Sequence, residues 1–401
     1  MEDPPRNTPI KPFTATPVAD AIDWIRMNDP ATLDLQIELT EIPSPPFGEG
    51  PRGDWMADRF NEFGLSEVRK DSVGNVLGWL SGSGENALIV SAHLDTVFPP
   101  DTDVTVSRDG DLLSAPGISD DGRGLAALLA LAGAFQSTSL ETETPVLLVA
   151  TVGEEGLGDL RGVKHLFSEG GPGHEAAGFI SLDGAGITRI VSSAIGSYRF
   201  RATLRGQGGH SWVDFGIPNP LHALARVVSA WTSIALPPSP VTTLTVARTG
   251  GGTSINAIPS EAWVEVDLRS EDADSLARLK QEALEIARRV VATESGKAPE
   301  DQRLRLEIEV LGERPPGACD PKTPLLHVAI AATEEVGAKP RTVASSTDAN
   351  VPMSLGIPAI TLGAGGNAGL AHTRDEWYQN DKGVEGLVRA LLTIVGFAGV
   401  R

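Results

Sequence analysis

Short runs of apolar residues recur in the first half and near the end of the chain, and each run ends in polar residues. Four such runs span residues 87–92, 145–152, 178–182 and 358–362. Continuous apolar runs of this length are typical of strands that are buried on both faces of a parallel sheet. An Ala- and Leu-rich stretch at 125–135 follows Asp-Asp-Gly and predicts a buried helix. The pattern therefore predicts an α/β fold with a mixed, mainly parallel sheet flanked by helices.

The middle of the chain has a different pattern. Three segments alternate between apolar and polar residues, which is typical of strands with one exposed face: 198–204, 262–268 and 303–310. Two further segments predict amphipathic helices, at 221–231 and 276–292. We therefore expect a smaller α+β domain at 195–312, inserted into a discontinuous larger domain formed by 1–194 and 313–401.

Composition excludes some classes of partner. The 401 residues include 53 acidic and 33 basic side chains, and a net charge of −20 argues against a general nucleic-acid or anionic-membrane binder. Residues 1–13 lack the pattern of a signal peptide, and no apolar stretch reaches the length of about 20 residues that spans a membrane. The single cysteine, Cys319, permits no intrachain disulfide and no cysteine metal cluster, which fits a cytoplasmic protein.

Candidate chemical groups cluster just after the predicted strands, where open α/β sheets place their ligands. They are His93, Asp95, the pair Asp120-Asp121, the pair Glu154-Glu155, Asp183 and His372. Each alone is weak evidence for a functional site, because Asp-Asp before glycine is usually a turn or helix cap and adjacent glutamates are usually solvated. Together at one sheet edge they would repel each other, and a bound divalent cation is the ordinary remedy.

Histidines and carboxylates without a thiolate suit Zn²⁺, and also Mn²⁺ or Co²⁺. Two histidines and at least three carboxylates exceed the needs of one catalytic zinc, whereas two ions about 3.5–4 Å apart would use them all. One glutamate of the Glu154-Glu155 pair would then be free to act as a general base. The Gly-rich segment 363–369 could also form a phosphate-binding loop, but the Lys-Ser/Thr of a nucleotide-binding loop is missing.

The order of these groups resembles the co-catalytic zinc peptidases, which include peptidase T, dipeptidases, glutamate carboxypeptidases, aminoacylases and succinyl-diaminopimelate desuccinylase. The resemblance extends from about residue 35 to 395 and rests on five ordered blocks: HLD at 93–95, DDG at 120–122, EE at 154–155, DG at 183–184 and HT at 372–373. It implies the zinc-exopeptidase type of fold. It also implies that His93 and Asp183 bind one metal ion, that Glu155 and His372 bind the other, and that Asp120 bridges them.

The same resemblance assigns further roles. Asp95 would orient His93, and Glu154 would take a proton from the metal-bridging water and deliver it to the leaving amine. In the inserted domain, GQGGHS contains His210, GGTSINAIP contains Asn256 and DLR contains Arg269. In the family such a histidine polarises the scissile carbonyl, often in the site of the other subunit of a homodimer, and the Asn and Arg hold a substrate carboxylate. A polar loop histidine and a surface ion pair remain open alternatives for His210 and Arg269.

The substrate class rests on resemblance as well. Peptidase T and the dipeptidases tend to have Asp where this chain has Asp183, whereas the deacylases tend to have Glu. We therefore expect an aminopeptidase, tripeptidase or dipeptidase that acts on small peptides. An N-acyl amino acid deacylase or a glutamate-type carboxypeptidase of the same family is the alternative. A non-catalytic binding dimer is disfavoured because every expected ligand and the base are present.

Overall fold

The computed structural model describes residues 11–296 and 298–401. Most of residues 1–13, which lack the pattern of a signal peptide, therefore lie outside the described residues. The chain divides into two compact units. Unit 1 comprises Met1–Ala194 and Ala318–Arg401, and unit 2 comprises Ile195–Gly317. The second boundary lies beyond the expected position at 312, because strand β14 continues to Arg314.

Unit 1 is built on a nine-stranded sheet in the order β1-β2-β6-β3-β7-β17-β8-β15, with β16 paired to β8. Its centre is four mutually parallel strands, which correspond to the four predicted apolar runs: β6 (Val146–Thr151), β3 (Leu88–His93), β7 (Gly178–Leu182) and β17 (Ala359–Leu362). The outer strands are β1 (Ser66–Lys70), β2 (Val76–Ser81), β8 (Arg189–Ala194), β15 (Gly317–Ala318) and β16 (Arg341–Ser345). Because β1, β2 and β17 also make antiparallel pairs, the prediction of a mixed, mainly parallel sheet is confirmed.

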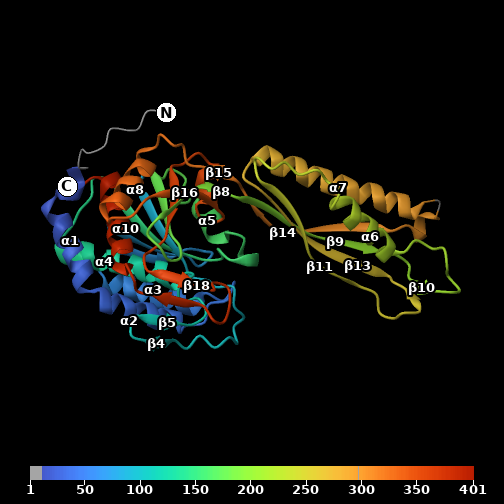
Figure 1. Cartoon of the computed structure of the whole chain (residues 1–401), viewed down its shortest axis with the longest axis horizontal. Coiled ribbons are helices and arrows are strands. Elements are labelled where there is room, and N and C mark those ends of the chain that lie inside the picture. Colours follow the sequence, from blue (N-terminus) through green and yellow to red (C-terminus); the bar gives the residue numbers. More distant parts are fainter. Residues whose placement is uncertain (1–10, 297) are drawn as a thin grey trace. The chain divides into compact units, whose positions relative to one another are not determined.

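The central strands are buried on both faces, which explains their continuous apolar sequences. Leu88 and Val90 of β3 belong to one core, whereas Ile89 between them belongs to another. The first core is formed with helices α1 (Thr16–Met27), α2 (Asp29–Thr40), α3 (Gly50–Glu62), α4 (Gly122–Thr138), α8 (Pro324–Glu335) and α10 (Gly383–Ala398). The second is formed with α5 (Arg161–Leu166) and α9 (Asn350–Ser354). This layering is visible in Figure 1.

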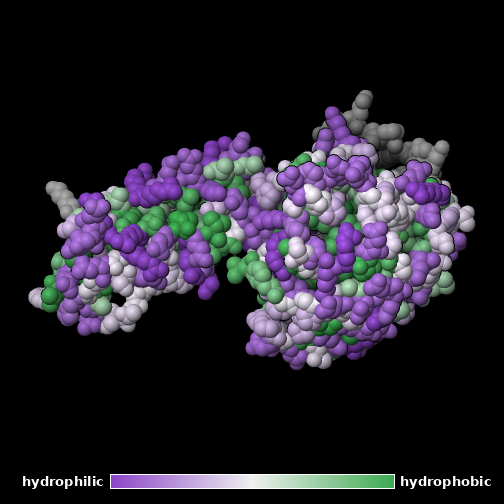
Figure 2. All heavy atoms as spheres, turned by 180° about the vertical axis from the view of Figure 1, so that it is seen from behind, coloured by the Kyte–Doolittle hydropathy of each residue, from purple (hydrophilic) through white to green (hydrophobic). Residues whose placement is uncertain are grey.

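A smaller sheet in unit 1 has the order β18-β19-β5-β4. It comprises β4 (Ser107–Asp109), β5 (Leu112–Ser114), β18 (Asn367–Gly369) and β19 (Trp377–Gln379), and short 3-10 helices lie at Lys11–Thr14 and Gly156–Gly158. Hydrophilic residues cover most of the face seen in Figure 2. Within the part of the chain that the structure describes, no helix combines the length and the apolar character needed to cross a membrane.

Unit 2 contains a four-stranded antiparallel sheet in the order β11-β13-β9-β14. The strands are β9 (Gly196–Arg205), β11 (Thr242–Gly251), β13 (Glu261–Ser270) and β14 (Arg305–Arg314), and helices α6 (Pro220–Trp231) and α7 (Ala273–Ser295) pack on one face (Figure 1). The opposite face bears cross-strand ion pairs such as Arg201 with Glu265 at 2.5 Å. Two further pieces complete the unit: strands β10 (Gly209–His210) and β12 (Ala257–Ile258), which pair with each other, and a 3-10 turn at Glu300–Gln302.

The Gly-rich segment after β17 is held by close packing of one backbone against another. An added Cβ on Gly386 of α10 would lie 2.2 Å from backbone atoms of Gly365. Two buried arginines fix the same segment, because Arg123 Nε donates to the carbonyl oxygen of Ala364 at 2.9 Å and Arg389 Nη2 donates to that of Gly363 at 2.7 Å. These contacts explain why glycines occur in this segment without a bound phosphate.

We expect Gly386→Ala to lower the free energy of unfolding by about 1–3 kcal/mol, because the backbone of Gly365 cannot rotate away from the added methyl group. This loss exceeds the roughly 1 kcal/mol that alanine gains from helix propensity. The shift in the midpoint of urea unfolding measures it. Gly50→Ala is the matched control, since nothing lies within 4 Å of its Cβ position at the start of α3. A stabilised Gly386→Ala protein would contradict the packing argument.

Candidate metal centre

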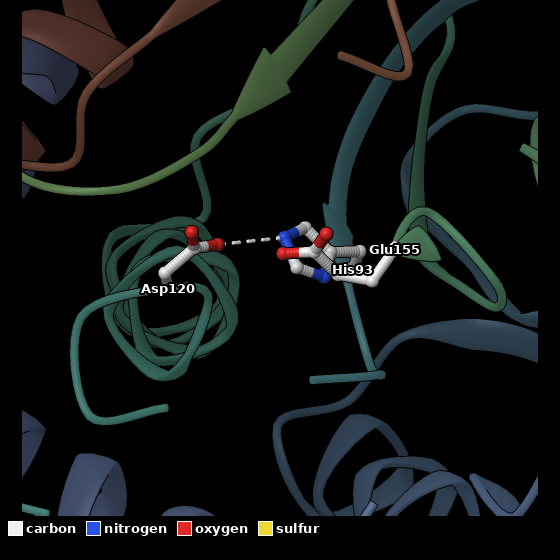
Figure 3. A group of neighbouring side chains, drawn as sticks. All are labelled: His93, Asp120 and Glu155. Carbon is white, nitrogen blue, oxygen red and sulfur yellow. Dashed lines mark hydrogen bonds and ion pairs between the residues drawn. The ribbon is translucent and has the colours of Figure 1, made fainter. Parts of the chain in front are cut away.

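Three of the predicted ligands form a group that could hold a metal ion. Ligand atoms of His93, Asp120 and Glu155 all lie within 4.8 Å of one another (Figure 3). His93 Nε2 lies 3.1 Å from Asp120 Oδ1. His372 joins the group, with its Nε2 at 3.1 Å from Asp120 Oδ2 and at 2.8 Å from Glu155 Oε1. The two oxygens of Asp120 therefore face two different histidines.

The topology explains why residues so distant in sequence meet here. His93 is the last residue of β3, Glu155 follows the neighbouring parallel strand β6, and Asp183 follows β7 on the other side of β3. Carboxyl ends of neighbouring parallel strands lie at one edge of the sheet. Asp120 arrives in the turn before α4, and His372 arrives in the loop between β18 and β19 with a φ of 65°.

Asp183 is electrostatically coupled to this group. Burial and then the charges of Asp120 and Glu155 raise the pKa of Asp183 to about 7, although His93 acts in the opposite direction. The charge of Asp183 also raises the pKa of the buried Asp121, for which burial is the main cause. The carboxylates of Asp120, Glu155 and Asp183 thus lie in one another's field, and their mutual repulsion favours a cation among them.

The same carboxylates raise the pKa values of His93 and His372. Hydrogen bonds with Asp120 and Glu155 raise the pKa of His372 to about 10. Burial alone would lower the pKa of His93, but the contact with Asp120 and the surrounding carboxylates outweigh it and the pKa is raised. Burial would raise the pKa of Asp120, but the two histidines outweigh it and the pKa is lowered. The carboxylates thus favour positive charge among them, and the imidazole and carboxylate donors fit Zn²⁺, Mn²⁺ or Co²⁺.

Asp95 is fully buried and holds the turn that carries the two glutamates. Its Oδ1 accepts from the amide of Glu154 at 2.9 Å and its Oδ2 from the amide of Glu155 at 2.7 Å. The ring of His93 contacts the main chain of Asp95, with Nδ1 at 2.9 Å from the carbonyl oxygen, whereas the nearest carboxylate oxygen is 3.8 Å away. Asp95 therefore contacts His93 mainly through its carbonyl group, and its carboxylate positions Glu154 and Glu155. Burial raises the pKa of Asp95 to about 6.

Glu154 lies in the same turn as Glu155, three residues after the end of β6, and it is buried. Because its own amide is bonded to Asp95, its main-chain position is fixed relative to that of Glu155. Glu154 is therefore a carboxylate next in the chain to a member of the metal-binding group, and a general base for the site is sought at such a position.

Glu376 is a functional residue that the sequence patterns did not indicate. This buried carboxylate accepts from the amides of Gly117, Ser119 and Asp120 at 2.9–3.0 Å and from the hydroxyl of Ser119 at 2.6 Å. It thereby fixes the turn that presents Asp120. The only signal in the sequence is an acidic residue four positions after His372, which is too common a pattern to single out.

Asp121, the second acid of the Asp-Asp pair, accepts hydrogen bonds from three backbone amides. Oδ1 of Asp121 caps α4 through the amide of Gly124 at 3.1 Å and also accepts from the amide of Gly184 at 3.2 Å. Its Oδ2 accepts from the amide of His93 at 3.0 Å. Asp121 thus ties together three of the segments that carry the predicted ligands.

In unit 2 the structure brings His210 and Asn256 together. His210 pairs with Ala257 across β10 and β12, and the amide of Ser211 donates to the carbonyl oxygen of Asn256 at 3.0 Å. Nδ1 of His210 accepts from the amides of Trp212 and Val213 at 3.2 and 3.4 Å. Because Nδ1 is the acceptor, the neutral ring carries its proton on Nε2, which makes Nε2 a hydrogen-bond donor.

Arg269 lies apart from these two residues. It is near the end of β13, where it pairs with Asp267 at 2.8 Å, and its side chain is 40% exposed. The Asn256 turn adjoins the start of the same strand. From Ala262 to Arg269 the strand rises by about 24 Å, at about 3.4 Å per residue.

Comparison with known proteins places this chain in a family. Residues 89–396 match Peptidase family M20/M25/M40. Similar solved structures include aminopeptidase PepT from Bacillus cereus, at 22% identity and a TM-score of 0.71 over 92% of this chain and 97% of that chain. The dipeptidase Dug1p from Saccharomyces cerevisiae has 14% identity and a TM-score of 0.72, over 95% of this chain and 98% of that one.

A dinuclear metal-binding M20 peptidase from Bacillus subtilis is also similar, at 15% identity and a TM-score of 0.65 over 93% of this chain and 98% of that chain. No protein of curated function matches the sequence. The structural likenesses agree with the predicted fold, and the family match extends over more than half of the sequence and includes all of the predicted metal ligands. The chain therefore belongs to Peptidase family M20/M25/M40 and is a hydrolase, as its motifs predicted.

Proposed function

We propose that this protein cleaves a peptide bond in small peptides that have a free amino end, as an aminopeptidase, tripeptidase or dipeptidase with two divalent metal ions. The observation that carries the proposal is the convergence of His93, Asp120, Glu155 and His372. The buried Glu154 precedes Glu155 in the same turn. The similarity to an aminopeptidase and a dipeptidase of the family supports the choice of a peptide substrate over an N-acyl amino acid. Cys319, which is unpaired and buried, supports a cytoplasmic location.

We assign His93 and Asp183 to one ion, Glu155 and His372 to the other, and Asp120 to both. The division of the two Asp120 oxygens between His93 and His372 supports this bridging role. Zn²⁺ suits the donors best, with Co²⁺ or Mn²⁺ as alternatives. When bound, such ions polarise the scissile carbonyl and make water more acidic.

The remaining steps belong to the chain's own residues. Glu154 accepts a proton from the attacking water and delivers it to the amine that leaves, which balances the protons of the hydrolysis. The Nε2 proton of His210 can be donated to the oxygen on which negative charge develops. Asn256 and Arg269 offer an amide and a guanidinium to a substrate carboxylate.

The layout of unit 2 supports a homodimer. His210 and Asn256 lie at one end of β13 and Arg269 near the other, about 24 Å along the strand. An extended dipeptide or tripeptide is at most about 7–11 Å long. One small peptide cannot reach both ends of the same unit 2, so we propose that His210 and Asn256 act in the site of a second copy.

The substrate class predicts a simple result with a matched pair of peptides. The zinc-loaded protein should cleave a free-amine tripeptide but not the same peptide with an acetylated amino end, because we expect recognition of the α-amine. Separation of the products by chromatography gives the bond that breaks. Cleavage of the acetylated peptide would instead identify a deacylase or carboxypeptidase, according to that bond.

Glu154→Gln should retain both metal ions and lose turnover by about 10²–10⁴-fold, the usual contribution of a general base. Asp120→Ala is the contrasting variant, because removal of the bridge should lower the bound metal. Metal content by elemental analysis and turnover are measured on the same samples. Near-wild-type turnover of Glu154→Gln would refute the base, and full metal occupancy of Asp120→Ala would refute the bridge.

A shared site predicts complementation between inactive variants. Equal amounts of His210→Ala and Glu154→Gln, after subunit exchange, should recover about one quarter of wild-type activity, because half of the dimers are mixed and each has one intact site. Glu154→Gln mixed with Asp120→Ala is the control and should recover none, since both substitutions affect the same half of the site. Failure of the first mixture to recover, with exchange verified by mass spectrometry, would place the whole site on one chain.

A further inference from the structure

Some large apolar side chains of unit 1 are exposed to solvent. Five such residues are exposed in the described part of unit 1: Met27, Phe47, Leu157, Leu355 and Leu370. Scattered exposed apolar residues need no explanation. Three of these five, however, lie on the loops that carry or support the metal-binding group, and these three are Phe47, Leu157 and Leu370.

Two of the three are neighbours of the proposed ligands in the chain. Leu157 is two residues after Glu155, at the outside of a turn that closes when the amide of Gly158 donates to the carbonyl oxygen of Glu155 at 2.8 Å. Its side chain is 64% exposed. Leu370 is two residues before His372 and is 57% exposed.

Phe47 reaches the same turn through an arginine. The guanidinium of Arg161 lies 4.9 Å from the centre of the Phe47 ring, and its Nη2 is 2.7 Å from the buried carboxylate of Glu49. Arg161 also packs directly on Gly153, where an added Cβ would lie 2.2 Å from its Nη1. Arg161 thus holds the exposed Phe47 ring beside the turn that continues from Gly153 into Glu154.

Backbone conformation argues that these side chains are not incidental. Phe47 has a φ of 67° and Leu370 has a φ of 57°, a region that bulky residues rarely adopt and that glycine adopts without cost. Burial of the side chain does not offset this backbone strain, since Phe47 is 66% exposed and Leu370 is 57% exposed. Strained residues of this kind concentrate at sites that bind ligands.

We propose that Phe47, Leu157 and Leu370 form an apolar rim at the metal centre that receives a large aliphatic or aromatic side chain of the peptide substrate. The inference rests on the proposed function, because it is the metal centre that brings the peptide to these residues. Binding sites commonly combine a few convergent polar groups with an apolar lining. Here the polar groups contact the peptide bond, and the rim contacts the side chain next to it.

The test compares three free-amine tripeptides: Leu-Gly-Gly, Gly-Leu-Gly and Gly-Gly-Gly. We expect the zinc-loaded wild-type protein to have a kcat/KM about 10–100-fold higher for at least one leucine peptide than for Gly-Gly-Gly. Phe47→Ala, Leu157→Ala and Leu370→Ala should each reduce that ratio by roughly three- to tenfold. Phe47→Gly is a second variant at the strained position, because it removes the ring without adding strain.

Leu355→Ala is the matched control. Leu355 has the same exposed fraction as Leu370, 57%, but follows α9 and adjoins no proposed ligand in the chain. This variant should keep the wild-type ratio. Equal loss of activity on all three peptides, or loss of ratio together with a change in oligomeric state by light scattering, would overturn the rim.

The outcomes also separate this inference from the function on which it rests. Cleavage of Gly-Gly-Gly as fast as both leucine peptides would overturn the rim and leave the peptidase in place. Cleavage of none of the three by a protein that contains both metal ions would overturn the proposed function and the rim with it.

Discussion

The concentration of carboxylates at one edge of the unit 1 sheet is the constraint around which the site is arranged. Burial and then the neighbouring charges of Asp120 and Glu155 hold the pKa of Asp183 near 7, while hydrogen bonds with the same two acids raise that of His372 to about 10. Protonated histidines thus balance acids that could not all be ionised in each other's presence. A divalent ion would provide the same balance and release those protons, so metal binding and protonation compete for one set of atoms.

A charge-dense site of this kind keeps its geometry only if the backbone is fixed. Three buried acids do this without belonging to the ligand set. Asp95 accepts from the amides of Glu154 and Glu155, Asp121 from that of His93, and Glu376 from that of Asp120. Each carboxyl group accepts from backbone amides and thereby fixes a segment that carries a ligand. The division between acids that face the site and acids that hold its loops explains why so many acidic residues gather here.

The sequence predicted those parts of the fold that have a periodic or chemical signature. The four central strands were recognisable because both faces are buried, and their shared direction then predicted that His93, Glu155 and Asp183 would converge. Glu376 was missed because one acidic residue that accepts from backbone amides leaves no periodic signal. Strand β11 was missed because most of its residues are exposed and its alternation is weak. The strained Phe47 could not be predicted either, since positive φ at a non-glycine residue is set by tertiary contacts.

The polar centre and the apolar rim have different consequences for specificity. Every peptide presents the same carbonyl and amide to the metal-binding group, so that group cannot distinguish one side chain from another. Burial of a leucine side chain contributes about 1.5–3 kcal/mol, which corresponds to roughly 10–100-fold in affinity. Phe47 is placed to supply such selectivity because its ring packs against Arg161, which pairs with Glu49, before any ligand arrives. The Phe47 side chain then loses less conformational entropy on binding. More of the free energy of its apolar contact therefore contributes to the difference in affinity between substrate side chains.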